Sequence, residues 1–447
     1  IVLASYVFYG WWDWRFLSLI LFSTIVDYLI GQKLRTEDKQ SKRKALLWTS
    51  IIVNLGFLGF FKYYNFFLEN FVDAFSLFGM QINTNSLNII LPVGISFYTF
   101  QTLSYTIDVY NRKLEPTKDF IAFSAFVCFF PQLVAGPIER ATHLLPQFYK
   151  KRTFEYDKAV DGMRQILWGL FKKVVIADNC AEFANQIFNN SADLNGSTLV
   201  LGAIFFAFQI YGDFSGYSDI AIGTSRLFSF DIKQNFATPY FSKNIIEFWR
   251  RWHISLSKWL TDYVFTPLAL ELRHFEKTGI IISLLITFLL SGLWHGAGWN
   301  FILYGLIHAI YFLITLSILG HKKSFNSNSE DKIIPSLKDS LSMILTFVLV
   351  SFSYIFFRAE NLSHAFSYIG GIFSKSFFEI PLVRPRFVFL VILFMIIEWF
   401  GRDGKFAIEK IFLSFNKTWR FIFYTIIIVL MLLFFTEEKQ PFIYFQF

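Results

Sequence analysis

The 447-residue chain has few charged residues and almost no cysteine. Charged side chains make up 17% of the sequence, whereas soluble domains carry about 25%. The two cysteines, Cys128 and Cys180, form no C-x-x-C pair. The sequence also contains no H-E-x-x-H motif and no close histidine pair. We therefore expect neither a cysteine-based redox pair nor a metal site.

The residues that replace the missing charges are apolar and aromatic. Hydrophobic residues make up 54% of the chain and aromatic residues 21%, and mean hydropathy is +0.46. The apolar residues form long runs, and a run of about 18 can cross the hydrocarbon core of a membrane as a helix. This pattern predicts an all-α polytopic membrane protein with roughly eleven spans. Prolines and glycines interrupt some runs, as around Pro92 and Pro131, so re-entrant or interfacial helices are expected as well.

The net charge of +8 does not indicate nucleic-acid binding. Lysine and arginine collect in short loops such as 32–44 and 149–158, whereas 189–197 has neither. The positive-inside bias then places the basic loops in the cytoplasm and 189–197 outside. No repeat or long linker divides the sequence, so a single membrane domain over 1–447 is the simplest interpretation. The chain starts inside an apolar run, and we expect further residues upstream.

An ionisable side chain at membrane depth is costly and is a functional candidate by default. His295, in "SGLWHGAGWN", is flanked by apolar stretches on both sides. A neutral imidazole can take a proton from a hydroxyl group near neutral pH. The alternative is a histidine that joins helices by a hydrogen bond. The spacing alone leaves both interpretations open.

Residues around His295 could form the walls of a ligand site. Glycines leave room for a close approach of the ligand, and tryptophans offer flat apolar surfaces. The glycines are Gly292, Gly296 and Gly298. The candidate contacts for substrate or donor in this segment are Ser291, Trp294, Trp299 and Asn300.

A second histidine, His253, lies in the tryptophan-rich stretch "EFWRRWHISLSKWL". Its neighbours Arg250 and Arg251 are candidates for binding the phosphate groups of a donor. The alternative is an interfacial segment whose rings and cations lie at headgroup depth. The stretch itself does not decide between these interpretations.

Two aspartates, Asp213 and Asp219, lie in the apolar stretch "YGDFSGYSDIAIG". A carboxylate there could orient a histidine, or it could pair with one of the arginines, which we favour. His308 follows His295 by more than three helical turns, so we expect it to serve packing or hydrogen bonding between helices.

Several motifs together resemble the membrane-bound O-acyltransferase family, and within it the bacterial branch that acetylates alginate, peptidoglycan and cellulose. They are "LPVGISFYTFQTLSYTIDVY", "FFPQLVAGPIER", "QIYGDFSGYSDIAIG", "FWRRWHISLSKWLTDYVFTPL" and "LLSGLWHGAGWNFILYGLIHA". The resemblance implies helices around a central funnel or tunnel. It implies that His295 is catalytic and that His253 occupies the earlier histidine-or-asparagine position of the family.

The resemblance also implies a reaction and partners. Acetyl-CoA on the cytoplasmic side of the bacterial inner membrane would be the donor, without a metal. The acetyl group would pass to an extracytoplasmic polysaccharide, with the help of a partner that has an SGNH or serine-hydrolase-like fold. One alternative is transfer of D-alanine from a carrier protein to teichoic acid. Another is a transporter that uses His295 and Asp213 as a proton relay.

Overall fold

The protein is described here by a computed structural model that covers residues 1–77, 80, 86–325, 333–383, 385–410, 415–436 and 440–443. Within these ranges the regular structure is helical, and no strand occurs. The chain folds into two compact units. Unit 1 contains Ile1–Phe154 and Phe228–Lys233, and unit 2 contains Glu155–Leu227 and Gln234–Phe447. The single domain over 1–447 stays a prediction.

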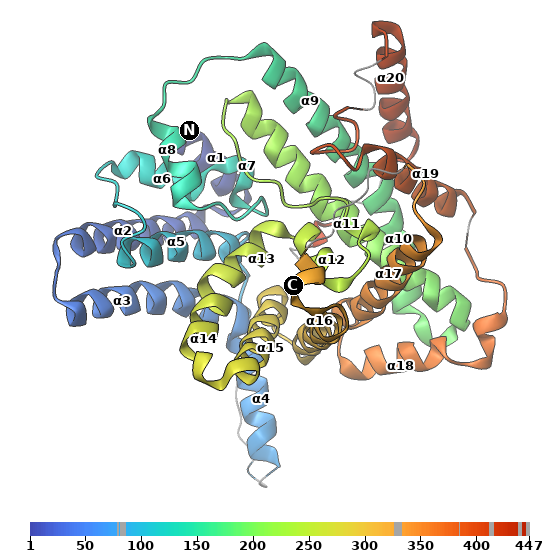
Figure 1. Cartoon of the computed structure of the whole chain (residues 1–447), viewed down its shortest axis with the longest axis horizontal. Coiled ribbons are helices and arrows are strands. Elements are labelled where there is room, and N and C mark those ends of the chain that lie inside the picture. Colours follow the sequence, from blue (N-terminus) through green and yellow to red (C-terminus); the bar gives the residue numbers. More distant parts are fainter. Residues whose placement is uncertain are drawn as a thin grey trace. The chain divides into compact units, whose positions relative to one another are not determined.

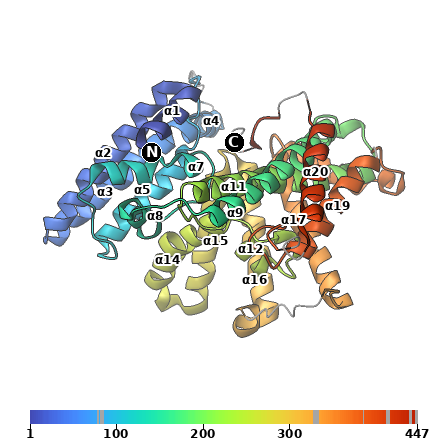
Figure 2. The ribbon, with the colours of Figure 1, turned by 90° about the horizontal axis from the view of Figure 1, so that it is seen from above.

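Unit 1 contains eight α-helices among its described residues. They are α1 (Val2–Asp13), α2 (Leu17–Thr36), α3 (Gln40–Leu58), α4 (Tyr64–Ser76), α5 (Ile95–Tyr110), α6 (Phe120–Cys128), α7 (Phe130–Leu133) and α8 (Ala141–Tyr149). Helices α2, α3 and α5 lie side by side (Figures 1 and 2). A buried carboxylate joins them, because Asp27 on α2 accepts hydrogen bonds from Asn54 on α3 (2.9 Å) and Thr106 on α5 (3.2 Å).

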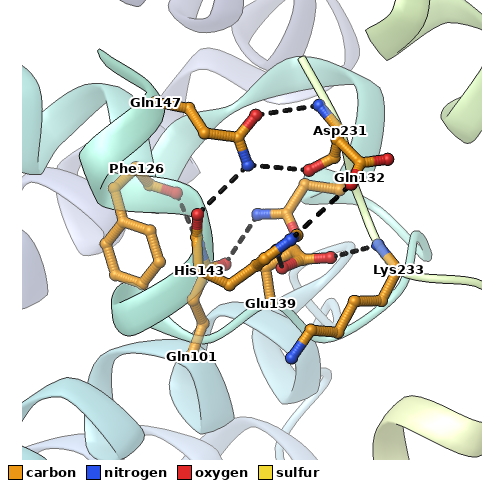
Figure 3. A network of polar contacts seen from close by, with 8 residues as sticks. All are labelled: Gln101, Phe126, Gln132, Glu139, His143, Gln147, Asp231 and Lys233. Carbon is orange, nitrogen blue, oxygen red and sulfur yellow. Dashed lines mark hydrogen bonds and ion pairs between the residues drawn. The ribbon is translucent and has the colours of Figure 1, made fainter. Parts of the chain in front are cut away.

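A network at α8 holds the segment Phe228–Lys233 within unit 1 (Figure 3). One oxygen of the buried Glu139 carboxylate contacts His143 Nδ1 at 2.7 Å, and the other accepts from the backbone N–H of Lys233 at 2.6 Å. The amide of Gln147 exchanges two hydrogen bonds of 2.8 Å with the backbone of Asp231. The segment after α11 is therefore fixed by specific polar contacts.

Unit 2 contains the remaining helices. They are α9 (Tyr156–Phe171), α10 (Asp178–Asn189), α11 (Gly196–Leu227), α12 (Ile245–Arg251), α13 (Ile254–Leu260), α14 (Thr266–Glu271), α15 (Glu276–His295), α16 (Trp299–Phe325), α17 (Leu337–Arg358), α18 (Leu362–Ile372), α19 (Pro385–Gly401) and α20 (Lys417–Leu433). Helix α9 runs beside α11 in both views (Figures 1 and 2). Helices α15 and α16 form a hairpin, and α17 packs on α11 and α16.

Six helical stretches within the described ranges are long and apolar enough to cross a membrane. They are Val2–Thr36, Gln40–Ser76, Gly196–Leu227, Arg273–His295, Trp299–Gly320 and Leu337–Arg358. The polytopic all-α prediction is thus confirmed, but the number eleven is not. Several expected spans are shorter helices, since α5 has 16 residues and α19 and α20 have 17 each. The breaks predicted near Pro92 and Pro131 are present: α5 starts after Gly94 (φ 76°), and α6 and α7 are separate.

Candidate functional site

His253 lies at the turn between the short helices α12 and α13 of unit 2. Its backbone has φ 42° and ψ 53°, the left-handed region that residues other than glycine seldom adopt. The side chain is completely buried. Strained backbone at a buried turn persists only where the surrounding structure fixes it, and such positions cluster at functional sites.

An aromatic enclosure surrounds the imidazole of His253. The ring of Phe214 on α11 lies 4.7 Å away between centroids, that of Trp294 on α15 5.4 Å and that of Phe236 6.3 Å. His253 is outside the six candidate spans. Burial lowers the pKa of its imidazole to about 3, because an apolar environment disfavours the charged form. The ring is therefore neutral at physiological pH.

His295 is the last residue of α15 and is also buried. Its ring packs at 5.1 Å from Phe357 on α17 and 6.0 Å from Tyr304 on α16. The adjacent Trp294 is buried too, with its ring 5.0 Å from that of His295. Three helices thus fix the direction of this imidazole.

The fold brings His253 and His295 together although 42 positions separate them in the sequence. Their ring centroids are 6.4 Å apart, and the ring planes are inclined by 61°. Hydrogen bonds to oxygen span about 2.8 Å, so a single oxygen atom near both rings could contact both imidazoles. Two imidazoles placed this close together in an apolar enclosure can bind a hydroxyl group, and one of them can take its proton.

The glycines near His295 do not leave the space that we expected for a ligand. A Cβ atom on Gly292 would meet the backbone oxygen of Phe301 at 2.2 Å, and one on Gly296 would meet the Phe301 ring at 2.2 Å. These glycines therefore allow α15 and α16 to approach each other. The expectation was wrong for Gly292 and Gly296, because protein atoms fill the room beside them.

The other predicted residues of this segment have different surroundings. Ser291 is buried one turn before His295, and the Asn300 side chain donates to the backbone oxygen of Ala359 at 2.9 Å. Trp299 starts α16 and is 55% exposed. Trp294 borders both histidines. The binding roles of Ser291, Trp299 and Asn300 stay predictions.

The two arginines before His253 differ in exposure. Arg250 is exposed, whereas Arg251 is half-buried and pairs with Glu247 at 2.8 Å. Arg251 lines a cavity of about 220 Å³ together with Lys243, Trp399 and Arg402. Three carboxylates also line this cavity, so their negative charges offset the positive charges of the cations. They are Glu247, Asp339 and Asp403.

Asp213 and Asp219 form ion pairs, but with lysines. Lys173 lies 2.8 Å from Asp213, and Lys172 lies 2.5 Å from Asp219. Both lysines belong to the π-helical turn Lys172–Ala177 between α9 and α10. The expectation of an arginine partner was wrong, because the helix that packs along α11 is the one that carries these lysines. A backbone N–H, that of Ile443, also donates to Asp213 at 2.7 Å.

His308 has the structural role that we expected. Its Nδ1 accepts from the indole of Trp249 at 3.2 Å, and its Nε2 lies 2.9 Å from the hydroxyl of Ser353. These bonds tie α12 and α17 to α16. Within the described residues no group of three histidine, cysteine or acidic side chains could hold a metal ion.

The sequence interpretation missed Asn235, which is buried beside His253 and bonded to it at 3.2 Å. It belongs to the polar stretch "DIKQNFATPY", for which we predicted no role in the site. The aromatic residues Phe214 and Phe357 were missed as well. No spacing rule connects them to a histidine, because they come from helices far apart in the sequence.

The comparison with known families identifies one match. Residues 110–356 match the profile of MBOAT, the membrane-bound O-acyltransferase family. The matched region begins at the last residue of α5 and ends within α17. It contains both His253 and His295.

Known proteins resemble the chain over a greater length. "Probable alginate O-acetylase AlgI" of Pseudomonas aeruginosa is 37% identical over 409 residues, which are 90% of this chain and 75% of that protein. Peptidoglycan O-acetyltransferase of Helicobacter pylori is 35% identical over 398 residues, or 83% and 73% of the two chains. Teichoic acid D-alanyltransferase of Bacillus subtilis is 29% identical over 290 residues, or 62% and 71%.

Proposed function

The chain belongs to the membrane-bound O-acyltransferase family, and from this premise we propose that it transfers acetyl groups from acetyl-CoA to an extracytoplasmic polysaccharide. It is a multi-pass membrane O-acyltransferase. The names of the alginate and peptidoglycan relatives support acetyl as the group transferred. The proposed location is the bacterial inner membrane.

The observation that carries this proposal is the buried pair of His253 and His295, with ring centroids 6.4 Å apart. In the proposed reaction His295 accepts the proton of the acceptor hydroxyl while the oxygen attacks the thioester carbonyl. The C–S bond then breaks, and the proton passes to the thiolate that leaves. A positioned base of this kind accounts for about 10²–10⁴-fold in rate.

The donor would enter near Arg251. The 220 Å³ cavity at this residue offers aromatic surfaces from Phe241 and Trp399, which suit a nucleotide base, and three cations for phosphate groups. These cations already have acidic neighbours, as in the pairs Arg251–Glu247 (2.8 Å) and Lys243–Asp339 (3.1 Å). A phosphate would therefore have to compete with carboxylates, and the energy gained from each contact would be modest.

On the extracytoplasmic side, we propose that a partner with an SGNH or serine-hydrolase-like fold takes part in the transfer to the polysaccharide. The hydroxyl group that attacks the thioester can belong to the polymer or to a serine of such a partner. Both acceptors present the same O–H group to the two histidines. The partner would add selectivity for the polymer.

The first test compares wild-type protein in lipid vesicles with His295→Ala, using radiolabelled acetyl-CoA. Transfer of label to water or to an added acceptor should fall by about 10²–10⁴-fold in the variant. His274→Ala is the matched control, since His274 is an exposed histidine of the same unit. An unchanged rate in His295→Ala would refute the proposal.

The resemblance to teichoic acid D-alanyltransferase motivates one alternative. A donor carried on a protein would then replace acetyl-CoA, and D-alanine would be transferred. Turnover with acetyl-CoA as the only donor would exclude this alternative. Turnover only with a D-alanyl thioester on a carrier protein would establish it and refute the acetyl proposal.

A further inference from the structure

Asn235 holds the turn that carries His253. Its side-chain oxygen accepts hydrogen bonds from the backbone N–H of Ser255 at 3.1 Å and from the Ser255 hydroxyl at 2.9 Å. The same oxygen lies 3.2 Å from His253 Nδ1. The backbone oxygen of Asn235 accepts from the N–H of Ile254 at 2.9 Å, and Ala237 N–H donates to Arg251 at 2.9 Å. The chain from 235 to 237 therefore supports both sides of the strained residue.

These contacts decide which nitrogen of His253 bears the proton. An amide can be turned so that its oxygen and nitrogen exchange places, and a histidine ring can be protonated on either nitrogen. The backbone N–H of Ser255 can only donate, so the atom of Asn235 that faces it must be the oxygen. Because that oxygen also faces His253 Nδ1 and can only accept, Nδ1 must carry the hydrogen.

We propose that Asn235 is a positioning residue that holds His253 as the neutral Nδ1–H tautomer, so that its Nε2 lone pair accepts a hydrogen bond from the hydroxyl group of the acetyl acceptor as that group binds, before the hydroxyl turns its single proton to His295 for the attack. This inference rests on the proposed function and extends it. A lone pair recognises an O–H donor, whereas an oxyanion needs an N–H donor. His253 therefore binds the attacking alcohol and does not stabilise the negative oxygen of the thioester carbonyl.

Asn235 is the polar side chain that the structure places against Nδ1 of His253. Among the described residues, the ring of His253 contacts Phe214, Phe236 and Trp294, which do not titrate, and His295, which does, at 6.4 Å. A cavity of about 20 Å³ beside Asn235 is lined in addition by charged groups of α11, α19, the turn after α9 and the segment that follows α19. They are Lys172, Asp219, Glu398 and Lys405.

The variant Asn235→Asp separates positioning from a purely structural role. It keeps the shape and the acceptor atom but puts a negative charge against Nδ1, which raises a histidine pKa by about 1–3 pH units. At pH 8 we expect a rate of acetyl transfer close to that of wild type. As pH falls to 5, the variant should lose up to about tenfold more activity than wild type, because protonation removes the Nε2 lone pair.

Two further variants provide the matched controls. Asn235→Ala removes the acceptor and frees the tautomer, so we expect a loss of at least about tenfold at every pH. Asn185→Asp adds a carboxylate elsewhere in unit 2, where its oxygen already accepts from Arg358 at 2.8 Å, and it should follow the wild-type pH profile. A wild-type pH profile in Asn235→Asp, or full activity in Asn235→Ala, would overturn the inference.

A second measurement does not depend on turnover. In protein labelled with ¹⁵N-histidine, the signals of His253 are assigned by their disappearance in His253→Asn. The inference predicts a protonated Nδ1 and an unprotonated Nε2. A proton on Nε2 would overturn it even in an active enzyme. If His253 shows the expected tautomer but the protein transfers no acetyl group, the proposed function is refuted. The role of Nε2 toward an acceptor is then refuted with it.

Discussion

His143 shows how close neighbours set the charge of a single histidine. Its Nδ1 lies 2.7 Å from the buried carboxylate of Glu139, and its Nε2 lies 3.8 Å from Asp231 (Figure 3). The hydrogen bond with Glu139 raises the pKa of His143 above its usual 6.5, against the opposing effect of burial. His143 lies on α8, outside the candidate spans. Its side chain is 28% exposed, which moderates the interaction through solvent screening.

This raised pKa predicts a dependence of stability on pH. A histidine that binds its proton more tightly in the folded state stabilises it fully below about pH 6.5, and the contribution disappears as pH rises through the folded pKa. The melting temperature of wild type should therefore fall between pH 6 and pH 8 by more than that of His143→Gln. Glu139→Gln, which removes the cause of the shift, should resemble His143→Gln. Equal falls in all three proteins would contradict this assignment.

Single residues also show the limits of sequence interpretation at the site. His295 and His253 were found because rare polar residues in apolar surroundings are visible in a sequence, and because the motifs around them resemble a family. Asn235 was not, since an asparagine in a polar stretch gives no sign that it will be buried. The lysine partners of Asp213 and Asp219 depend on which helix packs on α11, and that is a property of the fold.

The contact between α9 and α11 depends on glycines at matching positions. A Cβ atom on Gly216 would lie 2.8 Å from the backbone oxygen of Gly169, and one on Gly223 would lie 2.5 Å from that of Gly162. Small residues let membrane helices approach closely enough for backbone contact. The same contact brings Lys172 to Asp219. The close packing of α9 on α11 and the buried ion pair between Lys172 and Asp219 thus depend on each other.

The variant Gly216→Ala tests this contact. One methyl group must push the two backbones apart, and overpacking of this kind costs about 1–3 kcal/mol in the free energy of unfolding. Gly56→Ala on α3 is the control, because no atom lies within 4 Å of its added Cβ and alanine favours a helix. Thermal unfolding in detergent should show a lower melting temperature for Gly216→Ala only. Equal melting temperatures in both variants would contradict the close contact.

The sequence predicted where individual helices form more reliably than it predicted the number of membrane spans. Long apolar runs such as those of α11, α15, α16 and α17 became helices because a backbone in an apolar environment must satisfy its own hydrogen bonds. The breaks at Gly94 and between α6 and α7 followed from glycine and proline. The number of spans is not confirmed, because runs of 16 or 17 residues lie at the limit of the required length, where composition does not distinguish a crossing from a shorter helix.

The direction in which the molecule crosses the membrane follows from α11 and the loops around it. Helix α11 has 32 residues and is about 48 Å long, more than the roughly 30 Å of the hydrocarbon core. Of its most apolar 18-residue window, 83% is buried within the protein. We therefore expect the two ends of this helix to lie on opposite sides of the membrane. The stretch 189–197, which leads into the start of α11, has no lysine or arginine, whereas the stretch 149–158, which leads into the start of α9, is basic.

Thiol labelling can test this arrangement directly. Cys128 and Cys180 are buried, so they give little background. By the positive-inside rule, a cysteine at the exposed Ala192 should react with a membrane-impermeant maleimide added to intact spheroplasts. A cysteine at the exposed Asp157 should react only after the membrane is opened. Labelling of both positions from the same side would contradict the predicted orientation. It would also place the proposed acetyl-CoA entrance at Arg251 in doubt, because that proposal requires the basic side to face the cytoplasm.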